Sequence, residues 1–198
     1  MHDVRERWLE LHKADRHAEN VEILADAVQE HPDTAELWLL LATSLFGAGR
    51  SDDALEAVAS AVERAPDDPI LLTRAGSLSF YLGDVANARA WADAAAQLAP
   101  RRFLFKEELR ELRRDIAERE KHAEAERTMT LAFANGPHVV GAGEALARLY
   151  AETGRTYAAY EVVVEALGHR PHDARLMQLR DELSAHVPPS FRAELEDD

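Results

Sequence analysis

The stretch 32-PDTAELWLLLATSLFGAGRSDDALEAVASAVERAP-66 decides how this chain folds. Apolar and small residues recur along both of its halves, as a helix with one buried face requires. Gly49 lies between the halves, and glycine permits backbone angles at a turn that other residues avoid. Pro66 ends the stretch, and proline cannot continue a helix. The stretch therefore predicts two helices joined by a tight turn.

The same residue types return elsewhere at an interval of 34 residues. They are Pro32, Pro66 and Pro100; Gly49 and Gly83; Ala54 and Ala88; and Ala27, Ala61 and Ala95. Each type has a mechanical reason to recur, since proline ends the unit, glycine forms its turn and alanine lets two helices approach closely. A shared interval across three residue types predicts tandem copies of one structural unit.

This spacing and these residue types resemble the tetratricopeptide repeat, a helix–turn–helix unit of 34 residues. The resemblance implies an all-α solenoid of helical hairpins, wound as a right-handed superhelix. We expect units at 1–34, 35–68 and 69–102, then a fourth at about 140–173 with a capping helix up to 186 and an acidic tail at 187–198. The first unit is degenerate, because Trp8, Asp15 and Asn20 replace a small residue, a glycine and an alanine.

Residues 103–139 interrupt the array. They contain neither glycine nor proline before Gly136 and Pro137, and their charges alternate in sign at spacings that are neighbours on a helix. Two interpretations follow: one long charged helix over about 105–133 with a loop after it, or a degenerate repeat with a short insertion. The absence of a turn residue favours the single helix.

Composition excludes several classes of function. The chain has no cysteine, so it has neither disulfides nor thiolate metal sites. Its net charge of −14 disfavours nucleic acid and anionic membranes as partners. Its longest apolar run, Leu37 to Ala42, is far too short to cross a membrane. No apolar segment follows the charges at the N-terminus, so we expect a cytoplasmic protein.

Motifs for catalysis or cofactor binding are absent from the sequence. His169 and His172 are separated by a proline and have no third ligand nearby, and Gly141-Ala142-Gly143 follows no predicted strand. We therefore expect no catalytic residues, no metal and no cofactor, and predict that the protein is not an enzyme.

The resemblance implies a concave groove lined by the first helix of each unit. The expected groove residues are Leu39, Leu40, Thr43, Phe46, Thr73, Arg74, Ser77, Phe80 and Tyr81. Such a surface predicts a non-catalytic adaptor that binds a protein or peptide partner in the groove, unless Phe46 and Phe80 only pack between units. The alternative is a structural assembly subunit that forms a homodimer through the 103–134 helix.

Overall fold

The structure is a computed structural model that describes residues 2–99, 104–139 and 141–196. These residues form eleven α-helices and no strand. Tertiary contacts divide the chain into two compact units, Met1–Glu118 (unit 1) and Arg119–Asp198 (unit 2). The all-α prediction is confirmed, and each unit is described below by itself.

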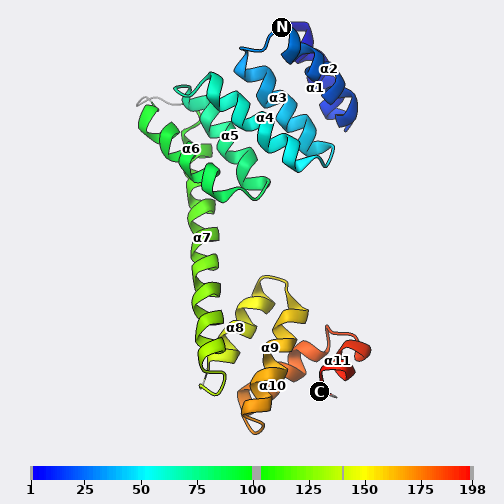
Figure 1. Ribbon diagram of the computed structural model, residues 1–198, viewed down its shortest axis with the longest axis vertical. Helices are drawn as coiled ribbons and strands as arrows, with labels where there is room; N and C mark the ends of the chain where they lie inside the picture. Colours follow the sequence, from blue (N-terminus) through cyan, green and yellow to red (C-terminus); the bar gives the residue numbers. More distant parts are fainter. Residues whose placement is uncertain (1, 100–103, 140, 197–198) are drawn as a thin grey trace. The chain divides into compact units, whose positions relative to one another are not determined.

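Unit 1 contains three antiparallel helix pairs that stack in chain order (Figure 1). The pairs are α1 (His2–Lys13) with α2 (His17–Glu30), α3 (Ala35–Gly47) with α4 (Ser51–Arg64), and α5 (Pro69–Tyr81) with α6 (Val85–Leu98). These pairs lie within residues 1–34, 35–68 and 69–102, the ranges expected for the first three units. Pro100, the third of the recurring prolines, lies outside the described residues.

Glycine and alanine form these hairpins as their spacing predicts. Gly49 and Gly83 have φ of +76° and +88°, a left-handed conformation that a residue with a Cβ adopts at a cost. The second helix then returns so closely that Ala54 and Ala88 are completely buried. A Cβ added at Gly76 would lie 3.2 Å from the carbonyl oxygen of Ala88.

The degenerate first hairpin reaches the same shape with other residues. Asp15 has φ of +53° and forms the turn without glycine. Asn20, buried where the other hairpins have alanine, donates from Nδ2 to the carbonyl oxygen of Trp8 at 3.1 Å. The Trp8 indole in turn donates to Ser44 Oγ at 3.1 Å, which ties the first hairpin to the second.

The interruption is one continuous helix, α7 (Lys106–Asn135), as the single-helix interpretation predicted. Its first part belongs to unit 1, where Leu109, Leu112 and Ile116 pack against a cluster that includes Leu72 and Ala92. Its last part belongs to unit 2, where Phe133 is buried.

Unit 2 continues with α8 (Ala142–Glu152), α9 (Thr156–His169), α10 (Ala174–Ser184) and α11 (Pro189–Glu196) (Figure 1). Helices α8 and α9 form a hairpin around Gly154, whose φ is +78°. Leu176, Leu179 and Leu183 of α10 are buried in the same core, as a capping helix requires.

The end of the chain differs from the predicted solvated tail. Residues 189–196 are helical, and Phe191 packs against the core of unit 2 with its ring 5.1 Å from that of Tyr157. Val187 is buried before the helix begins. These apolar residues anchor a segment whose charges alone suggested a tail, while residues 197 and 198 lie outside the described part of the chain.

Among the described residues, no helix is both long enough and apolar enough to cross a membrane.

Candidate functional site

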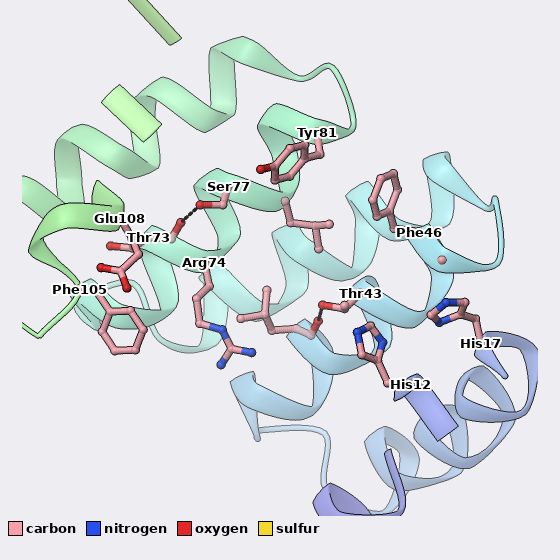
Figure 2. A pocket seen from close by; sticks show the side chains of 13 residues that line it. His12, His17, Thr43, Phe46, Thr73, Arg74, Ser77, Tyr81, Phe105 and Glu108 are labelled. Atoms are coloured by element: carbon pink, nitrogen blue, oxygen red, sulfur yellow. Dashed lines mark hydrogen bonds between the residues drawn. The ribbon is translucent and has the colours of Figure 1, made fainter. Parts of the chain in front are cut away.

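Unit 1 carries an open groove of about 540 Å³ (Figure 2). Its walls come mainly from α1, α3 and α5, the first helices of the three hairpins, with His17 at the start of α2, Phe105, and Glu108 in the first turn of α7. The lining residues are His12, His17, Leu39, Thr43, Phe46, Gly47, Thr73, Arg74, Ser77, Leu78, Tyr81, Phe105 and Glu108. Most of its lining residues belong to the first helices of the hairpins, where the resemblance implies a groove.

Most of the predicted groove residues line this groove. They are Leu39, Thr43, Phe46, Thr73, Arg74, Ser77 and Tyr81. The remaining two lie elsewhere. Leu40 belongs to the core of unit 1 and is not among the lining residues, whereas Leu39, which is equally buried, lies beneath the groove floor. Phe80 packs against the cluster formed with α7, because Leu112 and its neighbours cover that face of α5.

The hydroxyl groups of Thr43, Thr73 and Ser77 already donate hydrogen bonds within their own helices. Thr43 donates to the carbonyl oxygen of Leu39 at 2.9 Å, and Thr73 to that of Pro69 at 2.7 Å. Ser77 donates to the carbonyl oxygen of Thr73 at 3.1 Å. A ligand therefore meets methyl groups and oxygen acceptors here, with no free hydroxyl donor from these three residues.

Two aromatic side chains lie at one side of the groove. Phe46 is 40% exposed and Tyr81 is 73% exposed, although both are large and Phe46 is wholly apolar. They come from α3 and α5, and Figure 2 shows them on the same side of the opening. Exposed aromatic side chains beside an apolar floor commonly anchor a partner.

Two histidines lie at one end of the groove, His12 in the last turn of α1 and His17 at the start of α2. The His12 ring stacks on Trp8 at 4.9 Å between centroids, and the His17 ring meets His12 edge-on at 5.3 Å. The Nδ1 atoms of both histidines are buried without a hydrogen-bond partner among the described residues. Gly47 makes room for this arrangement, because a Cβ there would lie 2.5 Å from the His17 ring.

Charged side chains lie toward the α7 end. Arg74 and Glu108 both line the groove, and within the described part of the chain neither has an ion-pair partner. A neighbouring depression of about 350 Å³ shares Leu39, Arg74 and Phe105 with the groove. Its other charges are already engaged, since Arg5 pairs with Glu36 and Asp68 accepts from the backbone at the start of α5.

The sequence did not indicate the histidines, Gly47 or the α7 residues as groove residues. Phe105 and Glu108 lie outside the recognised repeats, so the spacing assigned them no role. Gly47 has no counterpart at the 34-residue interval, where Tyr81 stands instead. The available signal was its departure from the repeat, since a glycine in the last turn of an apolar helix implies a close neighbour.

No group of three or more histidine, aspartate and glutamate side chains among the described residues is arranged to hold a metal ion. That the protein is not an enzyme stays a prediction.

Comparison with known proteins agrees with this architecture. Residues 11–73 match the family model described as tetratricopeptide repeat. No curated protein matches the chain significantly.

Several solved structures share the fold at low sequence identity. The type III secretion chaperone SycD of Yersinia enterocolitica, in complex with a peptide of the translocator YopD, has a TM-score of 0.51 at 13% identity over 60% of this chain and 93% of that one. The TPR domain of P58(IPK) has a TM-score of 0.54 at 16% identity, over 92% of this chain and 54% of that one. PilW, a type IV pilus biogenesis factor, has a TM-score of 0.53 at 15% identity, over 98% and 97%.

At these identities the solved structures establish the fold alone. The 34-residue spacing, the stacked hairpins with left-handed glycines, and the family match agree with one another. Residues 11–73 therefore match the tetratricopeptide repeat family, and the chain shares the fold of tetratricopeptide repeat structures.

Proposed function

We propose that the protein is a non-catalytic adaptor that binds a segment of another polypeptide in the groove of unit 1. The observation that carries the proposal is an open, largely apolar groove of about 540 Å³ beside two exposed aromatic side chains. Pockets of roughly 300–1,000 Å³ bury small ligands or a few side chains of a larger one. The groove is open rather than closed over, which suits a segment of a longer chain.

The chemistry of the walls favours apolar side chains in the partner. The hydroxyls of Thr43, Thr73 and Ser77 donate to their own helices, so they present methyl groups and acceptors. Leu39 and Leu78 supply a hydrocarbon floor. A polar side chain placed on this hydrocarbon floor would lose water without regaining hydrogen bonds, whereas an apolar side chain gains by burial there.

The two charged side chains of the groove would orient a bound segment. Arg74 offers an unpaired guanidinium, and Glu108 offers an unpaired carboxylate within the described part of the chain. A segment with an acidic group near Arg74 and a basic group near Glu108 would be oriented by them. The partner we infer is therefore a peptide with two or three large apolar residues and both signs of charge.

Relatives in fold support a role in holding polypeptides. SycD, whose fold this chain shares, forms a complex with a peptide of a translocator protein. That complex concerns SycD alone, but it is consistent with peptide binding by the fold. Nucleic acid, membrane and cofactor remain unexpected partners on the grounds of charge and sequence, and a cytoplasmic location remains a prediction.

The test is selection of a random peptide display library on the whole protein. Enriched peptides should be rich in leucine, isoleucine, phenylalanine and methionine. Their affinity should fall by about 30-fold or more when Phe46→Glu and Tyr81→Glu are combined, since even one anchoring residue contributes about 2 kcal/mol or more. Fluorescence polarisation with a labelled synthetic copy of the best peptide measures this.

The matched control is Ala59→Glu with Leu98→Glu. Both residues are exposed on second helices, α4 and α6, away from the groove lining. This pair should leave both peptide affinity and helical circular dichroism unchanged. Equal losses in the two double variants, or a full-affinity complex with the groove variant, would place binding elsewhere.

A further inference from the structure

Helix α7 contains the residue pattern of a complete repeat. The residue pattern of 106–139 occurs again in 140–173, 34 positions later. Proline, alanine and large apolar residues occupy the same positions in both segments. The coinciding pairs are Leu112 and Leu146, Ile116 and Tyr150, Ala125 and Ala159, Met129 and Val163, Ala132 and Ala166, and Pro137 and Pro171. The segment has the register of a hairpin but the structure of one continuous helix.

Its small residues lack the neighbour that they have in every other unit. Ala54, Ala88 and Ala159, the equivalents of Ala125, are 0% exposed, whereas Ala125 is partly exposed. Ala61, Ala95 and Ala166 are buried, whereas their equivalent Ala132 is exposed. In the hairpins the first helix covers these alanines. In α7 the first half of the helix leads away from them instead.

The turn residue explains why the hairpin is open. The position equivalent to Gly154 is Glu120, and Lys121, His122 and Ala123 follow it. Gly49, Gly83 and Gly154 all have φ between +76° and +88°, which glutamate adopts only with strain. Glutamate, lysine and alanine are all good helix formers, so the chain continues as a helix where other units reverse.

We infer that a second copy of this chain supplies the missing half of the hairpin. Two α7 helices would pair antiparallel and cross near residue 119, so that 106–118 of each copy contacts 122–135 of the other. In a two-fold symmetric dimer of this kind, each copy would supply the helix half that the other lacks, with the same contacts as inside the other hairpins. This arrangement is a domain-swapped dimer. This inference does not depend on peptide binding in the groove.

One residue departs from the pattern. Arg113 stands where Ala42, Gly76 and Ala147 allow close approach. Its guanidinium lies 3.2 Å from Asp93 of α6, and the side chain is thus held by a neighbouring helix within unit 1. We therefore expect the arginine to leave room for the second α7.

Paired cysteines test the arrangement in a chain that has none of its own. In α5 and α6 Gly76 faces Ala88, and the equivalent pair in α7 is Arg113 and Ala125. Twelve residues along one straight helix span about 18 Å, too far for a disulfide. The double variant Arg113→Cys with Ala125→Cys should therefore oxidise to a covalent dimer. Each single variant should stay uncrosslinked, because equal positions lie about 18 Å apart across the axis.

The other outcomes overturn the inference. An intramolecular disulfide in a monomer would mean that the chain closes its own hairpin, and no disulfide at all would mean that α7 stands alone. Light scattering of the unmodified protein, which needs no variant to fold, should give twice the mass of one chain. A monomeric mass at high protein concentration would contradict the inference directly.

The turn can be tested separately with Glu120→Gly. Glycine at this position lets the chain reverse, so the dissociation constant of the dimer should rise by about tenfold or more. The control Ala117→Gly also replaces a helix-favouring residue of α7, but at a position that is not equivalent to the turn glycine of the hairpins. It should leave dimer formation nearly unchanged. Equal effects of both variants would show that helix stability, rather than the missing turn, maintains the dimer.

Discussion

The α5/α6 hairpin and helix α7 carry closely similar patterns of residues and adopt different structures. Both have large apolar residues in the first half and alanines at equivalent positions in the second. Gly83 reverses the chain in one, with φ of +88°, and Glu120 continues the helix in the other. The comparison teaches that the apolar and alanine positions determine which helix faces can pack together. The turn residue determines whether the two halves of one chain pack on each other.

The largest effect should come from the contacts that hold α7 to unit 1. Leu112 is buried against Leu72 and the alanines of α6, so Leu112→Ala should lower the free energy of unfolding by about 2–4 kcal/mol. Leu131 of the same helix is 57% exposed, and Leu131→Ala should change it by less than about 0.5 kcal/mol. Urea denaturation followed by circular dichroism measures both. Similar losses would mean that α7 does not pack as described.

The next largest effect on stability should separate a buried alanine position in a hairpin from the equivalent, partly exposed position in α7. Ala88→Leu forces extra methylene groups into a completely buried contact and should cost about 1–3 kcal/mol. Ala125→Leu, at the equivalent position of α7, should cost much less when the protein is dilute enough to be monomeric. Thermal midpoints of the two variants decide. A large loss in the dilute Ala125 variant would mean that α7 is already covered within one chain.

The sequence contained the repeat and its turns, and the all-α solenoid followed from them. It left a degenerate repeat in α7 as the alternative to a single helix, because the recurring glycine is absent there and the proline interval lengthens to 37 residues between Pro100 and Pro137. It placed Leu40 and Phe80 in the groove, because a residue number on a helix gives an approximate direction but not which side a neighbour covers. His17 and Gly47 depend on each other across two hairpins, a contact that no local spacing encodes.

A smaller effect tests the turn itself. Gly83→Glu places the α7 turn residue into a hairpin that must reverse, and the left-handed backbone should cost about 1–2 kcal/mol. The control is Gly168→Glu, because Gly168 lies inside α9 with no atom close to its added Cβ. There glutamate should stabilise the helix by about 0.5–1 kcal/mol. Destabilisation by both substitutions would mean that the glutamate side chain, and not the backbone angle, is responsible.

The smallest effect concerns the ion pair that fixes the last part of α7 within unit 2. Arg155 donates to both carboxylate oxygens of Glu126, at 2.7 and 2.8 Å, and its guanidinium lies over the Tyr150 ring. The hydrogen bond from Arg155 lowers the pKa of Glu126, against the opposing effect of desolvation. Because the pKa is lower in the folded state, the pair stabilises unit 2 at neutral pH. That stabilisation is lost as the pH falls through the lowered pKa.

Glu126→Gln should therefore reduce stability at pH 7 by about 0.2–1 kcal/mol, the range for partly exposed pairs. At a pH well below the lowered pKa of Glu126 the variant and the unmodified protein should become equally stable, since both side chains are then uncharged. Glu124→Gln is the matched control, because Glu124 makes only a single exposed contact of 3.6 Å with Arg127. Amide hydrogen exchange at residues 126–135 should quicken in the Glu126 variant alone. If the difference persists at low pH, the side chain stabilises α7 by packing and not by charge.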